Sequence, residues 1–204
     1  MAEIWVVRSE GLPAPTAGYD LTIWDTAQLP SETQMRTWAG WAETHLLAGS
    51  PADLLMGFEP RPDLWPGTDF ALGGGKIWRF HHRFVAWLTP SLYQIPEVPR
   101  ALALAGVELM ISSNSATARD PALDPLWRAV QGNQVFGLAL GPEPALYVPC
   151  EIDPTQEGCM PLESDQGGWR TTLRFEDLDD ARRLFPVLPG LRMSLYRENG
   201  WWRS

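Results

Sequence analysis

The sequence predicts an α/β fold, and three observations in the middle of the chain carry this prediction. Phe84–Leu88 and Val107–Ser112 are short apolar runs of strand length. Pro96 opens a helix between them, because proline has no N–H to satisfy in a first helical turn, and Gly106 ends that helix. A strand, a sharp turn, a helix and a second strand is the order in which many α/β enzymes present a nucleophile. Pro90 occupies the turn in this chain.

Composition predicts one globular domain that covers residues 1–204. A chain of 204 residues buries about 70% of its unfolded surface. Hydrophobic residues make up 45% of it and charged residues 20%, which is typical of a globular protein. The net charge of −9 argues against nucleic acid or an anionic membrane as a partner, because phosphates are bound by basic surfaces.

The N-terminal sequence and the cysteines predict a reducing, cytoplasmic location. Met1–Gly11 contains no basic segment followed by an apolar one, and no apolar run reaches the length of a membrane span. Cys150 and Cys159 are the two cysteines. Free thiols fit such a compartment, although a disulfide between these two cysteines is left open.

Four elements are predicted before residue 60. Glu3–Arg8 is a first strand and Leu21–Trp24 a short extended piece. Glu32–Ala48 is predicted to be an amphipathic helix, because its apolar residues recur at a spacing of about 3.6. Ala52–Glu59 is a buried strand that ends in a carboxylate.

The rest of the chain alternates between loops, strands and helices. Arg61–Gly75 is rich in glycine and proline and is predicted to be a loop, and Lys76–Leu88 is predicted to be a hairpin that turns near His81 and His82. The later predictions are a helix at Asp120–Gly132, strands that begin at Asn133, Ala145 and Trp169, a hairpin turn at Asp165–Gly168 and a helix at Glu176–Leu184.

Several of these segments resemble one family in their order along the chain. IPEVPRALALAGVE resembles the pattern F-P-E-x-x-R-x-L-A-x-x-G-A-E, which follows the catalytic cysteine in the carbon–nitrogen hydrolases of the nitrilase and amidase superfamily. ADLLMGFE is similar to their A-D-L-V-V-F-P-E. Trp127, Arg128 and Val130 lie near their W-x-x-x-x-R-A-x-x-E-N pattern, with Gly132 in place of the glutamate. NQVF is similar to the N-Q-V-F that opens their next strand, and the tail from Phe185 to Tyr196 is similar to theirs.

The resemblance implies a nitrilase-like four-layer α-β-β-α sandwich that lacks part of the middle segment, including the strand with the catalytic lysine. It also implies dimerisation through the Pro96–Ala105 helix, the Asp120–Gly132 helix and the C-terminal tail. The family's cysteine falls on Pro90 and its glutamate on Glu59. Lys76 is the only lysine in the chain and so the only substitute for the third catalytic residue.

Other side chains are weak replacements for the missing thiol. Ser91 follows the turn but would need His81 or His82 as a base. Cys150 precedes Glu151, whose charge would raise the pKa of the thiol and lower its reactivity, and Cys159 lies in a predicted loop.

Neither a metal nor a cofactor is expected. With His45, the chain has three histidines, and their spacing does not match a zinc site.

Three functions therefore remain open. The first is a catalytically inactive homologue that serves as a binding, assembly or regulatory subunit, as a homo-oligomer or with a paralogous hydrolase subunit. The second is an active amidase, nitrilase or carbamoylase with a rearranged site. The third is a small-molecule sensor in which the former pocket holds an amide or nitrile-like ligand. Glu59 either lines that pocket or pairs with an arginine, and Trp201 and Trp202 are expected to dock on this subunit or on a partner.

Overall fold

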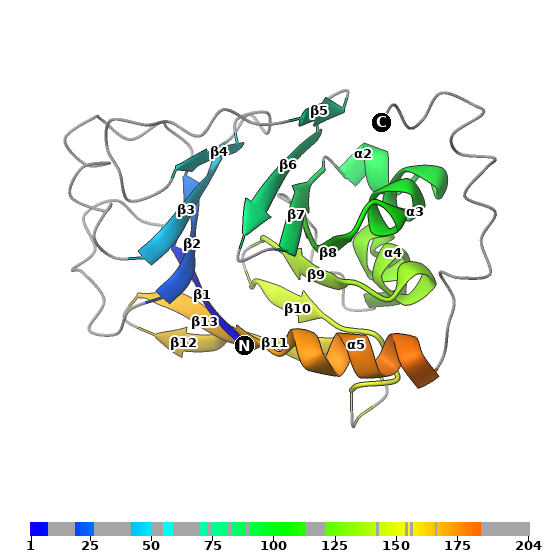
Figure 1. Cartoon of the computed structure of the whole chain (residues 1–204). Coiled ribbons are helices and arrows are strands. Elements are labelled where there is room, and N and C mark those ends of the chain that lie inside the picture. The colour runs from blue at the N-terminus through cyan, green and yellow to red at the C-terminus, as the bar shows by residue number, and fades with distance from the viewer. Residues whose placement is uncertain are drawn as a thin grey trace.

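The computed structural model describes residues 1–7, 19–26, 42–49, 55–58, 70–72, 75–80, 83–88, 90–112, 121–141, 143–153, 155, 157–165 and 167–184. Of residues 24–26, 42–49, 55–58, 70–72 and 75–80 it describes the backbone alone. The described part forms two β-sheets that pack face to face, with helices on the outer side of one of them (Figure 1).

The first sheet has six strands in the order β12-β13-β1-β2-β3-β4. Its central strands β1, β2 and β3 are parallel to one another, and the outer strands pair antiparallel to their neighbours. The strands are β1 (Ala2–Val7), β2 (Tyr19–Thr26), β3 (Ala42–Gly49), β4 (Leu55–Phe58), β12 (Glu163–Asp165) and β13 (Gly168–Leu173).

The second sheet has seven strands in the order β11-β10-β9-β8-β7-β6-β5. Strands β7, β8 and β9 form a parallel centre, and the strands on both sides are antiparallel. The strands are β5 (Phe70–Leu72), β6 (Gly75–Phe80), β7 (Arg83–Trp87), β8 (Val107–Ser112), β9 (Phe136–Ala139), β10 (Ala145–Tyr147) and β11 (Cys159–Pro161).

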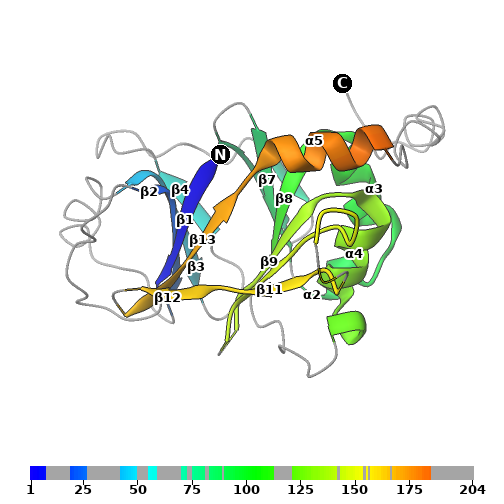
Figure 2. The same cartoon turned by 90° about the horizontal axis from the view of Figure 1, so that it is seen from below.

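Helices α2 (Pro90–Tyr93), α3 (Glu97–Leu104) and α4 (Pro125–Asn133) cover the outer face of the second sheet (Figure 1). A 3₁₀ turn, η1 (Pro121–Leu123), precedes α4. Helix α5 (Phe175–Leu184) follows β13 and lies across the bottom of the sandwich, as Figure 2 shows from below.

Alternation along the strands produces two hydrophobic cores. In β7, Val85 and Trp87 pack between the sheets, whereas Ala86 and Leu88 pack against the helices. This follows from the pleat, which sends successive side chains to opposite faces. The inter-sheet core also takes Ile4 from the first sheet. The predicted fold class, a nitrilase-like sandwich of helices and two sheets, is confirmed.

A cluster of charges joins α5 to the second sheet. Glu108 of β8 has a side chain only 8% exposed, and it accepts hydrogen bonds from Arg83 Nη1 at 2.8 and 2.9 Å and from Arg182 Nη1 at 2.9 Å. Burial by itself lowers the pKa of Arg83, but the carboxylates of Glu108 and Asp179 have the larger combined effect, so the pKa of Arg83 is raised above its usual value. Arg83 also lies over the ring of Phe175, 5.1 Å from its centroid.

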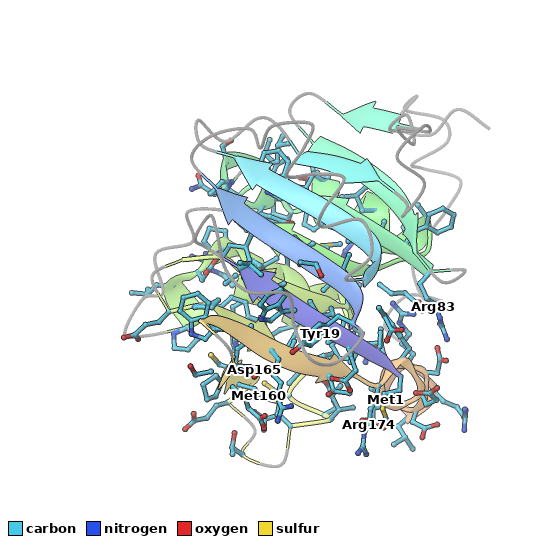
Figure 3. All side chains as sticks on the ribbon, turned by 90° about the vertical axis from the view of Figure 1, so that its left-hand side faces the viewer. Met1, Tyr19, Arg83, Met160, Asp165 and Arg174 are labelled. Atoms are coloured by element: carbon cyan, nitrogen blue, oxygen red, sulfur yellow. The ribbon has the colours of Figure 1, made fainter. Side chains whose placement is uncertain are left out.

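The first sheet has a polar cluster of its own, formed by residues of β1, β2 and β12. Tyr19 donates to Asp165 Oδ2 at 2.5 Å and stacks on Trp5, with ring centroids 5.5 Å apart. Figure 3 shows Tyr19 and Asp165 together on this side of the molecule. Burial, and then the hydrogen bond to Asp165, raises the pKa of Tyr19 to about 12.

Most predicted elements are present. The strand–helix–strand prediction is confirmed by β7, α3 and β8, and Gly106 ends the helix with a φ of +94°. The hairpin is confirmed by the antiparallel pairing of β6 with β7, and the second hairpin by that of β12 with β13. Strands β1, β2 and β4 and helix α5 also form where they were predicted.

The predicted helix at Glu32–Ala48 is wrong over its second half. Residues 42–48 belong to β3, which pairs parallel with β2 and antiparallel with β4, and residues 32–41 lie outside the described part. Because β3 lies between β2 and β4, nearly all of its backbone N–H and C=O groups find hydrogen-bond partners in these neighbouring strands. This pairing stabilises the strand although the apolar residues recur at helical spacing.

Smaller corrections concern element ends. The predicted loop Arg61–Gly75 contains β5 and the first residue of β6, because a third strand pairs there. The helix predicted from Asp120 begins at Pro125, since the side chain of Asp124 caps it by accepting from Leu126 N at 2.8 Å. That helix runs through Asn133, so the next strand begins at Phe136.

Cys159 is the first residue of β11 and not part of a loop. The predicted loss of part of the middle segment stays a prediction, because residues 59–69 are not described. No helix in the described ranges is both long and apolar enough to cross a membrane.

Candidate functional site

The candidate site is the place where β7 ends and α2 begins, at the carboxyl end of a parallel strand. Leu88 N donates to Ile111 O at 3.1 Å, which extends the β7–β8 pairing up to the turn. Tyr93 Oη donates to the same carbonyl at 2.7 Å and holds α2 against the sheet. Ligands of open α/β sheets commonly bind beyond the carboxyl ends of such strands. The geometry therefore matches a strand–turn–helix elbow.

Pro90 is the first residue of α2 and is half-buried. Its ring fits this position because proline presets the helical φ and has no N–H to leave unpaired. It also carries no thiol, hydroxyl or amine, so the position predicted for the nucleophile has no nucleophilic atom. Ser91 is the next helical residue and is exposed, and one helical step turns it about 100° away from Pro90.

Of the two other predicted catalytic residues, the structure describes only the backbone of Lys76 and nothing of Glu59. Strand register sets Lys76 of β6 opposite Trp87 of β7, so its backbone lies beside the elbow strand. The side chain of Lys76 is outside the described part, and so are Glu59, His81 and His82. The structure thus brings Lys76 and the elbow to neighbouring strands, and it leaves the position of Glu59 untested.

The two cysteines lie far from the elbow. Cys159 begins β11, which stands four strand spacings from β7, on the order of 19 Å at about 4.8 Å each. Cys150 follows β10, three spacings from β7, and both thiols are free. Burial, and then Glu151 and Asp153, raises the pKa of Cys150. Neither thiol has the low pKa that marks a nucleophile, which confirms the direction expected for Cys150.

Burial also raises the pKa of Cys159, with smaller effects from Glu157, Asp153 and Asp124. No group of three or more His, Cys, Asp and Glu side chains in the described ranges is arranged to hold a metal ion.

Trp87 is a site residue that the sequence analysis missed. Its side chain is 1% exposed between the two sheets, three residues before Pro90, and its Nε1–H has no hydrogen-bond partner in the described structure. A buried donor of this kind costs free energy unless an acceptor binds to it. The strand pattern of the sequence indicated that Trp87 faces the opposite side of β7 from Ala86 and Leu88. The chain has eleven tryptophans, however, and this pattern did not distinguish Trp87 from the others.

The arrangement of sheets, helices and elbow is the carbon–nitrogen hydrolase fold. The amidase from Nesterenkonia sp. AN1, a nitrilase-superfamily protein, superposes with a TM-score of 0.57 at 12% identity, and the match covers 99% of this chain and 100% of that one. A CN-hydrolase superfamily protein from Xanthomonas campestris, which holds an arsenic adduct in its active site, gives a TM-score of 0.63 at 11% identity over 94% of this chain and 97% of its own. No protein-family model and no curated protein matches the sequence.

Proposed function

We propose that this protein is a catalytically inactive subunit with the carbon–nitrogen hydrolase fold, and that it acts by binding or assembly. The observation that carries the proposal is Pro90 at the elbow, the position on which the resemblance places the catalytic cysteine. The subunit assembles with a second copy or with a paralogous hydrolase subunit.

The chemistry of the reaction explains why the replacement of the nucleophile at position 90 is expected to abolish activity. Carbon–nitrogen hydrolysis of this type needs a thiolate to attack carbon, a carboxylate to move the proton and a cation to stabilise the developing charge. Residues of such a unit act together, so removing the nucleophile alone removes nearly all of the rate. Ser91, Cys150 and Cys159 do not replace it, because one is exposed on another side of the helix and two are remote.

Assembly is supported by the outer helical layer. Helices α3 and α4 lie side by side on the second sheet (Figure 1), and the resemblance implies dimerisation through these two helices. A subunit that keeps this layer while it lacks the nucleophile retains the means of association without the chemistry. The cytoplasmic location and the single domain stay predictions from the sequence.

The test is covalent labelling together with turnover. A variant of the Nesterenkonia amidase carries the acetamide moiety of fluoroacetamide on its active-site cysteine. The present protein is incubated with fluoroacetamide, and intact mass is read alongside ammonia release from acetamide and butyramide. We expect no adduct and no ammonia above buffer.

The controls follow from the three catalytic positions. Pro90→Cys restores the thiol, and an adduct at position 90 would show that the elbow still presents this position. Turnover by the wild-type protein that disappears in Glu59→Gln or Lys76→Ala would overturn the proposal in favour of an active hydrolase with a rearranged site.

A second candidate, the small-molecule sensor, is favoured by Trp87. Its unpaired Nε1–H next to the elbow would donate to the carbonyl or nitrile of a bound amide or nitrile-like molecule. Native mass spectrometry of the protein from its own source tests this: a bound molecule lost in Trp87→Phe and in Glu59→Ala supports the sensor, and an empty protein contradicts it.

A further inference from the structure

A groove lies on the helical layer. It has a volume of about 550 Å³ and runs between the α2–α3 turn on one side and η1 with α4 on the other. Its residues include Tyr93, Arg100, Leu123, Arg128 and Gly132. This volume lies within the roughly 300–1,000 Å³ of typical ligand sites, so the groove has room for a few side chains.

Two arginines in the groove bind only neutral acceptors. Arg100 donates from Nε to Asn133 Oδ1 at 3.2 Å and from Nη2 to Gly132 O at 3.0 Å. Arg128 donates from Nη2 to Leu123 O at 3.2 Å. No carboxylate of the described chain pairs with either of them. Within the described part of the chain, the groove therefore presents two positive charges without a carboxylate partner, on a protein whose net charge is −9.

Gly132 explains why a carboxylate is missing. A Cβ atom built at this glycine would lie 3.8 Å from Arg100 Nη2, so a glutamate at position 132 would reach the guanidinium. The resembling pattern has arginine at the position of Arg100 and glutamate at that of Gly132. This chain keeps the cation and lacks the anion.

We infer that the groove receives an acidic segment of a different protein chain, whose carboxylates pair with Arg100 and Arg128. The inference deepens the proposed assembly role and rests on it. Carboxylates are the partners that guanidinium groups bind most strongly. The rim favours a peptide over a small ion, because Leu123 is 66% exposed and Ile95, beside the groove, is 44% exposed, and both are available for apolar contact.

A second copy of this chain is a poor occupant. A two-fold contact whose axis passes through the groove would set the two groove arginines of one protomer against the same two of the other. Like charges brought together in an interface repel each other and disfavour the complex. A partner with a complementary acidic surface avoids that cost, which favours a paralogous subunit over a homodimer.

The test measures binding of two fluorescent peptides by anisotropy at physiological salt. One peptide alternates glutamate with leucine, and the other alternates glutamine with leucine. We expect the glutamate peptide to bind at least about tenfold more tightly, since hydrogen bonds between charged groups are stronger than those to neutral groups. The double variant Arg100→Gln/Arg128→Gln and the single variant Gly132→Glu should remove this preference.

Two variants serve as matched controls. Arg174→Gln removes a positive charge from an exposed site between β13 and α5, and Gly132→Gln adds a side chain of similar size without charge. Both should retain the preference, and thermal unfolding checks that every variant is folded.

Equal binding of the two peptides, or a preference that survives in Gly132→Glu, would overturn the inference. Glutarate that competes as strongly as the peptide would identify a free dicarboxylate and not a protein segment. A homodimer, seen by native mass spectrometry, that dissociates in the arginine variants would identify a second copy. None of these outcomes depends on amide turnover, so they leave the test of the proposed function separate.

Discussion

Replacing Glu108 by glutamine tests whether the charge cluster holds α5 on the sandwich. The substitution preserves shape but removes the charge that Arg83 and Arg182 share. Glutamine keeps one acceptor oxygen, so at least one of the three charge-assisted hydrogen bonds is lost and the others are weakened. Among the described residues, Arg182 is then left without a carboxylate, and Arg83 keeps only Asp179, 3.5 Å away.

The size of the expected loss of stability depends on how deeply the ion pairs of Glu108 are buried. Removing one member of a buried ion pair costs about 3–5 kcal/mol. Here the side chains of Arg83 and Arg182 are 32% and 21% exposed, so water compensates part of the loss. We expect the free energy of unfolding to fall by about 2–3 kcal/mol. For a chain of this length that corresponds to a decrease in Tm of about 4–12 °C.

Urea denaturation measures the change, and hydrogen exchange locates it in α5. A matched control is Glu163→Gln, since Glu163 pairs with Arg170 at 2.8 Å but both side chains are more than half exposed. An exposed pair contributes little, so this variant should unfold near the wild-type midpoint. If Glu108→Gln unfolds no more easily than Glu163→Gln, or if α5 keeps its protection, the cluster does not hold the helix.

Two further predictions concern titrating groups. Because the pKa of Tyr19 is about 12 in the folded protein and about 10 when unfolded, the unfolded chain loses this proton first. The free energy of unfolding should therefore fall as pH rises from 10 to 12, a step measured by urea midpoints and absent in Tyr19→Phe; identical slopes in both proteins would contradict it. Since burial raises the pKa values of Cys150 and Cys159, a thiol reagent at neutral pH should modify both more slowly in the folded protein than in urea, and faster labelling of the folded protein would contradict this.

The candidate site could be predicted from the sequence only as a position. Pro90 at the elbow was predictable, because strand, turn and helix signals lie within a few residues of one another. The Nε1–H of Trp87, which has no partner in the described part of the structure, was not predictable, since hydrogen-bond partners depend on which side chains the facing sheet brings near it. That Arg100 pairs with neutral acceptors and with no carboxylate of the described residues likewise depends on α3 and α4 packing together.

The sequence by itself determined the local elements whose signals are short in range. The β7–α3–β8 unit, the hairpin of β6 and β7 and the helix α5 all follow from apolar periodicity and from proline or glycine at their ends. Only the tertiary structure decided that residues 42–49 form β3, because β2 and β4 supply their hydrogen bonds from outside the segment. Tertiary packing also buried Glu108 between two arginines from β7 and α5, since a charge pattern does not specify which distant residues meet.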